Sequence, residues 1–130
     1  LVVGAEYTVA ILEGHILPSI QIKTAREFYN FEAKYNDDDT GFLVPSGLND
    51  EDESRLQSLA RKAFDSLDCR YWGRVDFMQD HCTGEFHLLE VNTVPGLTSH
   101  SLVPMAAKAA GIDFNHLMKI IIGLSYGENL

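Results

Sequence analysis

Two neighbouring apolar runs of the sequence carry side chains that could hold a metal ion. Arg74 and Asp76 stand two residues apart in the first run, and Glu90 and Asn92 stand two apart in the next. Side chains two apart in a strand share one face of a sheet, so a tight hairpin would gather all four. Two carboxylates held that close repel one another, and such hard oxygen ligands suit Mg²⁺ or Mn²⁺. The alternative is a solvated strand face on which Arg74 simply pairs with one of the two acids.

A turn that follows these residues could bind an anion. Residues 93–101 include Gly96 and several small hydroxyl side chains, and they lead into a helix that we expect to begin near Ser101. Free backbone N–H groups at a helix N-terminus attract anions. An ordinary capped turn would have the same composition. A metal cluster beside an anion-binding turn indicates phosphate chemistry, because Mg²⁺ commonly bridges to substrate phosphates.

Runs of strand-forming residues predict two hairpins that would position these side chains. Glu6–Leu12 and Ile16–Lys23 form the first, and Pro18 marks its second run as an edge strand or a bulge. Tyr71–Gln79 and Glu85–Asn92 form the second. On its first strand Arg74, Asp76 and Met78 share a face, and on its second strand Phe86, Leu88, Glu90 and Asn92 point one way.

Apolar residues at helical spacing predict three helices. The first begins at Asp50, which we expect to be the N-cap, with Glu53 completing a capping box. The other two are expected at Ser101–Ala110 and from Asp113 to about Leu124. Strands that pair as hairpins, with helices in separate blocks, predict an α+β fold in which helices cover one face of a mostly antiparallel sheet.

The stretch from Thr24 to Leu48 carries no clear pattern and contains the polar run Asn36–Gly41. A segment of this length without regular structure is more often functional than accidental in a small domain. We therefore expect a functional loop there.

The composition is that of one globular domain and disfavours several classes of partner. The 130 residues are 45% hydrophobic and 22% charged, which is ordinary for a folded protein. The 19 Asp and Glu against 10 Lys and Arg give a formal charge of −9, which argues against binding nucleic acid or an anionic membrane. No apolar run approaches the roughly 18 residues of a membrane span. Cys69 and Cys82 follow no metal-ligand spacing, so we expect free thiols in a reducing cytosol.

Several motifs, in order and across nearly the whole chain, resemble the C-terminal part of D-alanine–D-alanine ligases, which are ATP-grasp enzymes. They are EYTVA at Glu6–Ala10, FEAKY at Phe31–Tyr35, GRVD at Gly73–Asp76 and LLEVNTVPGLTSHSLVP at Leu88–Pro104. The last run is specific to the family, whereas Glu-x-Asn alone is common to ATP-grasp ligases. The resemblance implies that residues 1–130 are the C-terminal, metal- and ATP-binding part of an ATP-grasp ligase domain.

The resemblance also implies a reaction and its residues. These bacterial cytoplasmic enzymes use ATP to phosphorylate one D-alanine, and the amine of a second attacks the acyl phosphate, giving D-alanyl-D-alanine for peptidoglycan. Two Mg²⁺ or Mn²⁺ ions would be bound by Asp76, Glu90 and Asn92, with Glu90 bridging them. The oxyanion hole would be formed by Arg74 and the N–H of Gly96, and Ser101 would hold the carboxylate of the second D-alanine. The ATP site would include Glu6, Lys34 and Leu89, and Tyr35 would fasten the loop that closes over it.

The N-terminal domain of these ligases and the first part of their ATP-grasp module have no counterpart in the sequence. The chain also begins at Leu1 rather than Met, so we expect a fragment that is inactive without that missing part. The unpaired strand edge expected near Leu1–Val3 could pair with a second copy of the chain, so a homodimer stays an alternative. Two other functions stay open as well. One is a related ligase making a D-alanyl ester or another dipeptide, of which Tyr35 disfavours the ester, and the other is a non-catalytic folding or interaction module.

Overall fold

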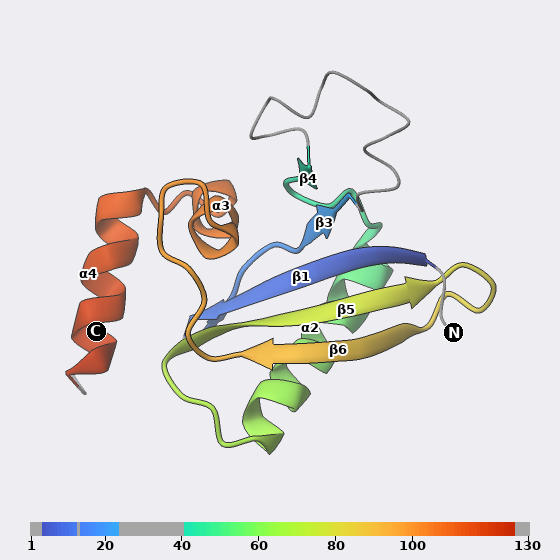
Figure 1. The fold of residues 1–130 in the computed structure, drawn as a ribbon, viewed down its shortest axis with the longest axis horizontal. Helices are drawn as coiled ribbons and strands as arrows, with labels where there is room; N and C mark the ends of the chain where they lie inside the picture. Colours follow the sequence, from blue (N-terminus) through green and yellow to red (C-terminus); the bar gives the residue numbers. More distant parts are fainter. Residues whose placement is uncertain (1–3, 13, 24–40, 127–130) are drawn as a thin grey trace.

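The fold is built on a six-stranded sheet in which each pairing is antiparallel (Figure 1). A computed structural model describes residues 4–12, 14–23 and 41–126 of the chain. The strands among them are β1 (Gly4–Leu12), β2 (His15–Ile16), β3 (Ile20–Ile22), β4 (Phe42–Leu43), β5 (Trp72–Asp80) and β6 (Phe86–Asn92). They lie in the order β4-β3-β1-β5-β6, and β2 pairs with the end of β1. The mostly antiparallel sheet expected from the sequence is confirmed.

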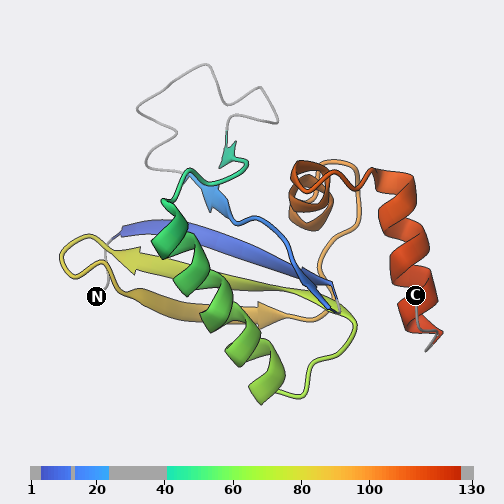
Figure 2. The same ribbon diagram turned by 180° about the vertical axis from the view of Figure 1, so that it is seen from behind.

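One face of the sheet packs against helix α2 (Asp50–Ser66), which crosses it diagonally (Figure 2). The helix buries Leu56, Ala60 and Phe64 at a helical spacing of four, which aligns them on one side. They meet a cluster of sheet residues that includes Tyr7, Val9, Ile11, Val75 and Phe77. Odd-numbered positions of β1 and β5 therefore face α2, because side chains alternate along a strand.

The opposite face carries a second apolar core at one end of β1. Here Ala10, Leu12 and Ile20 pack with residues of helices α3 (Leu102–Ala109) and α4 (Phe114–Ser125). The α+β class is confirmed, but the expectation that the helices share one face is wrong. An apolar stripe on a helix predicts that the helix packs on the sheet, and it does not specify which side of the sheet the chain reaches.

The three helices within the described residues begin at side chains that suit N-caps. Asn49 caps α2, and its Oδ1 accepts a hydrogen bond from the Asp52 N–H at 2.7 Å. The cap expected at Asp50 therefore lies one residue too late, because Asn and Asp are about equally good caps and stand next to each other. The two later helices fall where expected, with caps at Ser101 and Asp113.

Proline divides the second predicted strand. Pro18 has no N–H to donate to a ladder, and the run around it is split into β2 before it and β3 after it. The sequence pattern missed β4, whose two residues pair with β3. Residues 24–40, where we expect a functional loop, lie outside the described part of the chain.

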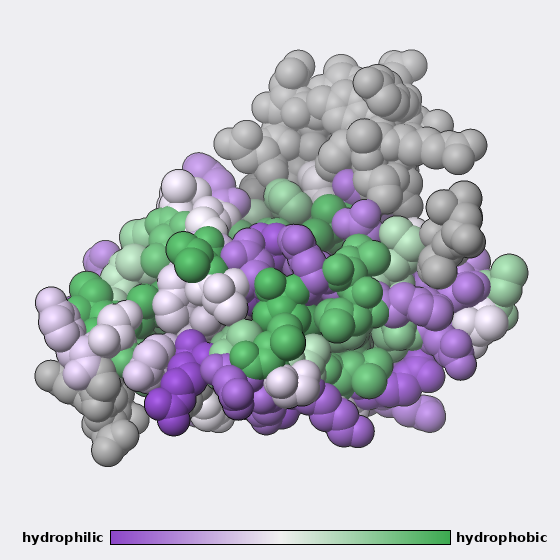
Figure 3. Space-filling view, turned by 60° about the horizontal axis from the view of Figure 1, so that its bottom comes forward, coloured by the Kyte–Doolittle hydropathy of each residue, from purple (hydrophilic) through white to green (hydrophobic). Residues whose placement is uncertain are grey.

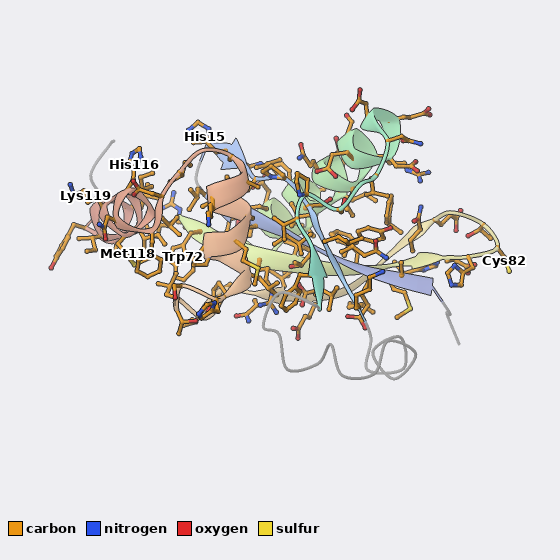
Figure 4. All side chains as sticks on the ribbon, turned by 90° about the horizontal axis from the view of Figure 1, so that it is seen from above. His15, Trp72, Cys82, His116, Met118 and Lys119 are labelled. Atoms are coloured by element: carbon orange, nitrogen blue, oxygen red, sulfur yellow. The ribbon has the colours of Figure 1, made fainter. Side chains whose placement is uncertain are left out.

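The turn between β5 and β6 is organised by Asp80. Its carboxylate accepts hydrogen bonds from the backbone N–H groups of Cys82, at 2.7 Å, and Thr83, at 3.3 Å. These bonds favour the ionised form and lower the pKa of Asp80 below its usual value. Both cysteines are free thiols, as expected, and Figure 4 shows Cys82 at the outer end of this hairpin, at the opposite end of the molecule from His116 and Lys119 of α4.

A buried polar cluster ties α2 to the segments on either side of the β3–β4 pair. Glu53, in the first turn of α2, accepts hydrogen bonds from the Ser19 N–H, at 2.9 Å, and from the Ser19 hydroxyl. The Gln57 amide donates to the same carboxylate at 2.9 Å. Because the Ser19 proton goes to Glu53, the Ser46 hydroxyl, 2.6 Å away, is the donor to Ser19. Ser19 precedes β3 and Ser46 follows β4, and the two strands are antiparallel. The Glu53 carboxylate therefore holds one end of this strand pair, directly at Ser19 and through Ser19 at Ser46.

We expect Glu53→Ala to lower the free energy of unfolding by about 1–3 kcal/mol, because it leaves the buried N–H and hydroxyl of Ser19 without their acceptor. Glu51→Ala is the matched control, since Glu51 is an exposed acid in the same helical turn and its removal has a similar effect on the helix dipole. Urea unfolding followed by circular dichroism measures both. Equal losses in the two variants would show that the cluster contributes nothing specific.

Candidate functional site

The register of the β5–β6 hairpin brings the predicted metal ligands together. Arg74 lies directly opposite Asn92, and Asp76 lies directly opposite Glu90. On the other side of β5, Asp76 pairs with Thr8 of β1. All five residues belong to the face that carries the α3 core, away from α2. The period-two argument from the sequence is therefore confirmed for these four side chains.

The Asp76 carboxylate is held by the Arg74 guanidinium through two hydrogen bonds. Arg74 Nε donates to Asp76 Oδ1 at 3.0 Å, and Nη2 donates to Oδ2 at 3.1 Å. The same Nη2 lies 3.9 Å from Glu90 Oε1. The side chains of Arg74 and Asp76 are 18% and 13% exposed, whereas that of Glu90 is 61% exposed. The pairing offered as an alternative to a metal site is thus present, and it leaves Glu90 open to solvent.

A bulge in β6 changes which side chains share this face. Beyond the Asp76–Glu90 pair, Phe77 lies opposite Leu88 and Met78 opposite His87, so Leu89 is the additional residue. One extra residue reverses the alternation on the bulged strand. The expectation that Phe86 and Leu88 share the face of Glu90 is therefore wrong.

Phe86 lies on the α2 face. Its ring makes edge contacts with Tyr7 and Phe77, at centroid distances of 5.9 and 6.5 Å, and the Arg55 guanidinium of α2 lies 5.0 Å from its centroid. Leu88 and Leu89 are each about half exposed, at 52% and 50%. Hydrophobic and hydrophilic side chains lie next to each other on the face of the molecule shown in Figure 3.

The end of β6 turns sharply after Asn92. The Asn92 Oδ1 accepts a hydrogen bond from the Val94 N–H at 3.0 Å, which closes the start of the turn. An amide oxygen has two lone pairs, so this bond leaves one acceptor site on Asn92. The side chain can therefore shape the turn and still serve as a ligand.

Gly96 and Ser101 come together within this turn. A Cβ placed on Gly96 would lie only 3.2 Å from Ser101 Oγ, so a glycine allows the close approach. Ser101 Oγ accepts from the Thr98 N–H at 2.9 Å and lies 2.8 Å from Thr98 Oγ1. The Ser101 side chain consequently makes no capping bond to the first turn of α3. That turn keeps N–H groups at Leu102 and Val103 that the cap does not satisfy, which is the arrangement that binds anions.

The remaining predicted site residues divide into two groups. Glu6 stands two positions before Thr8 on β1, opposite Met78 and Ile22, so it shares the face of Asp76. Leu89 stands at the bulge. Lys34 and Tyr35 lie outside the described residues.

The donor chemistry of this face fits a hard divalent cation. Within residues 4–12, 14–23 and 41–126, no three His, Cys, Asp or Glu side chains form a ligand group. The face supplies two carboxylates, Asp76 and Glu90, and the amide oxygen of Asn92. Mg²⁺ is usually bound by one or two carboxylates, with waters and substrate phosphates completing its six ligands. A sparse oxygen set of this kind suits Mg²⁺ or Mn²⁺ better than a metal that needs a full protein cage.

One polar contact of this site was missed by the sequence. The Thr8 hydroxyl donates to Asp76 Oδ1 at 2.6 Å. A threonine inside an apolar strand resembles any other β-former, and only the β1–β5 register reveals its partner. The alternation of side chains along β1 was the one available signal for this contact, because it places Thr8 on the same face as Glu6.

One open hollow among the described residues lies elsewhere. It has a volume of about 490 Å³ and is lined by Phe42, Val44, Met105, Lys108 and Ala109, between β4 and α3. None of these lining residues is a predicted site residue. Among the described residues, the candidate site is thus a face of the sheet, exposed at Glu90, together with the turn at its end.

Comparison with known proteins gives a consistent result. A family model described as the D-ala D-ala ligase C-terminus matches residues 1–123. The D-alanine–D-alanine ligase of Saccharophagus degradans is 55% identical over 121 residues, which cover 93% of this chain and 38% of that protein. The corresponding ligase of Marinobacter nauticus is 55% identical over 127 residues, covering 98% of this chain and 39% of that protein.

Solved structures show the same relationship. The D-alanine–D-alanine ligase of Bacillus anthracis complexed with ATP superimposes with a TM-score of 0.80 at 34% identity, covering 97% of this chain and 39% of that one. The VanG D-Ala:D-Ser ligase of Enterococcus faecalis gives 0.78 at 30% identity, covering 95% and 37%. The chain therefore spans about two fifths of the length of these relatives. By the match over residues 1–123, the chain belongs to the family of D-alanine–D-alanine ligase C-terminal regions.

Proposed function

We propose that this chain is the C-terminal part of a D-alanine–D-alanine ligase, which joins two D-alanines at the expense of ATP. The observation that carries the proposal is the alignment of Asp76, Glu90 and Asn92 on one sheet face that leads to the first turn of α3, to which the Ser101 side chain makes no hydrogen bond. Phosphoryl transfer to a carboxylate needs both a cation site and an anion site. The names of the relatives that are 54–56% identical support D-alanine as the substrate.

The reaction has two chemical steps. An oxygen of the first D-alanine carboxylate attacks the γ-phosphorus of ATP, and the bond to the leaving ADP oxygen breaks. The amine of the second D-alanine then attacks the acyl carbon, forming a tetrahedral intermediate with a negative oxygen. The C–O bond to phosphate breaks, the amine loses a proton, and D-alanyl-D-alanine and inorganic phosphate result.

Asp76, Glu90 and Asn92 would hold the divalent cations, Mg²⁺ or Mn²⁺, and two ions would be bound with Glu90 between them. When bound, these ions neutralise negative charge on the transferred phosphoryl group. Glu90 suits the position between the two ions because its side chain is more exposed than that of Asp76. The Asp76 carboxylate, by contrast, is fixed by its neighbours.

Other residues of the chain would bind the reacting groups. The Arg74 guanidinium and the Gly96 N–H would stabilise the negative oxygen of the tetrahedral intermediate. Ser101 and the N–H groups of the first turn of α3 would orient the carboxylate of the second D-alanine. The ATP site would include Glu6, Lys34 and Leu89, and Tyr35 would help exclude water from the acyl phosphate.

The chemistry of the chain supports a cytoplasmic location. ATP and the two free thiols, Cys69 and Cys82, suit the reducing cytoplasm of a bacterium. Among the described helices none combines the length and the apolar character that crossing a bilayer requires. The partner that this part of the ligase needs is the remainder of the ligase, with which residues 1–130 would complete the nucleotide site.

We expect the isolated chain to show no ligase turnover, because the relatives are about two and a half times as long and the proposed nucleotide site is incomplete. The measurement is a coupled assay of ADP release with D-alanine, ATP and Mg²⁺. A full-length D-alanine–D-alanine ligase is the positive control. Turnover comparable with that of the control would contradict this expectation.

We expect Glu90→Gln to weaken Mn²⁺ binding by the isolated chain at least about tenfold, because it removes a charged oxygen ligand. Glu85→Gln is the matched control, since Glu85 is an exposed acid on the same hairpin that lies outside the site. Electron paramagnetic resonance of free Mn²⁺ reports both affinities. Equal affinities in the two variants would remove Glu90 from the metal site.

A further inference from the structure

We propose that Thr8 is a positioning residue for the metal site, acting through Asp76. The hydroxyl of Thr8 occupies one oxygen of the Asp76 carboxylate and thereby presents the other oxygen to the cation. This inference rests on the proposed function, because it treats Asp76 as a metal ligand.

The geometry of the contact favours Asp76 as the acceptor of the Thr8 proton. Thr8 lies directly opposite Asp76 in the β1–β5 pair, and its Oγ1 is 2.6 Å from Oδ1. The other acceptor in reach is the carbonyl oxygen of Val75, at 3.5 Å. A hydroxyl has one proton, and a separation of about 2.6 Å is typical of an O–H that donates to an ionised carboxylate. The hydroxyl is therefore committed to Oδ1.

Burial makes this contact strong. Thr8 is 1% exposed, between Ile20 on one neighbouring strand and Asp76 on the other. A hydroxyl shielded from water loses free energy unless it is hydrogen-bonded, and the bond is stronger where the local dielectric constant is low. Because the pairing of β1 with β5 fixes the two backbones, neither the Thr8 hydroxyl nor the Asp76 carboxylate can turn away without a cost in free energy.

The hydrogen bonds divide the two carboxylate oxygens into different roles. Oδ1 accepts from Thr8 Oγ1 and from Arg74 Nε, whereas Oδ2 accepts from Arg74 Nη2. A carboxylate offers about four lone-pair sites, two on each oxygen. Among the described contacts, Oδ1 is fully used and one lone pair remains on Oδ2. With both of these partners in place, Asp76 would thus offer Oδ2 to a cation.

Thr8 contributes something that Arg74 cannot supply during the reaction. The guanidinium is proposed to stabilise the tetrahedral intermediate as well as to hold Asp76, so its position is set by both. Thr8 lies on a different strand and is buried, so its bond to Oδ1 does not depend on the position of the guanidinium. The carboxylate then keeps one orientation throughout.

The test compares Thr8→Val, which keeps the shape of the side chain and removes the hydroxyl, with Thr8→Ser, which keeps the hydroxyl. Mn²⁺ affinity of the full 130-residue chain is measured by electron paramagnetic resonance, and stability by urea unfolding. We expect Thr8→Val to weaken Mn²⁺ binding about tenfold or more, the range for removing a partner of a metal ligand. Thr8→Ser is expected to restore affinity close to that of the unchanged chain.

A control separates positioning from packing. Ile20→Val removes one methylene beside Thr8 and leaves every bond to Asp76 in place. It should lower stability slightly and leave Mn²⁺ affinity unchanged. If Ile20→Val and Thr8→Ser weaken Mn²⁺ binding as much as Thr8→Val does, the effect is packing and the proposal is overturned.

Asp76→Asn distinguishes this proposal from the proposed function. If Asp76→Asn weakens Mn²⁺ binding and Thr8→Val does not, the role of Thr8 is wrong and the metal site stands. If Asp76→Asn binds Mn²⁺ as the unchanged chain does, or if the unchanged chain binds none, the assignment of Asp76 as a ligand is wrong and the role of Thr8 falls with it.

Discussion

The antiparallel pairing of β1 with β5 is the constraint on which the rest of the structure depends. The two strands pair along their whole length, from Gly4 opposite Asp80 to Leu12 opposite Trp72. A shift of one residue would turn every side chain of a strand to the other face. This one register therefore places the apolar odd positions against α2 and brings Thr8 to Asp76 on the opposite face. The same pairing that forms the core also assembles the site.

The boundary between core and site on the second face follows from where α3 packs. Ala10 pairs with Arg74, and the α3 core covers Ala10 and Leu12 at this end of β1. Asp76, in the middle of the face, lies outside this apolar core. The chain must pass from Asn92 to α3 along this end, so the turn with Gly96 lies beside the polar positions. Gly73 allows β5 to pack closely against α2 and the end of β6, because a Cβ at this position would lie 2.7 Å from the Phe64 ring and 3.0 Å from the Asn92 carbonyl oxygen.

Sequence reasoning succeeded where one local rule was sufficient. The alternation of side chains predicted that Arg74, Asp76, Glu90 and Asn92 share a face, and the register confirms it. The same rule failed at Phe86, because a bulge adds one residue and leaves no distinct mark in the sequence. The contact of Thr8 with Asp76 joins residues that are 68 positions apart, so no local pattern could predict it. The resemblance supplied the chemistry of the site, and only the structure supplied its bonding.

The Arg74–Asp76 pair explains how this face can fold without a cation. Asp76 and Glu90 lie directly opposite each other, and like charges at such positions destabilise a sheet. Arg74 lies within 3.0 Å of one carboxylate and 3.9 Å of the other, so its charge offsets their repulsion. Its two bonds to the half-buried Asp76 also replace water that this carboxylate has lost. A bound cation would take over this neutralisation. In the proposed reaction the guanidinium would then interact with a developing negative oxygen, so a single arginine would serve both the fold and the reaction.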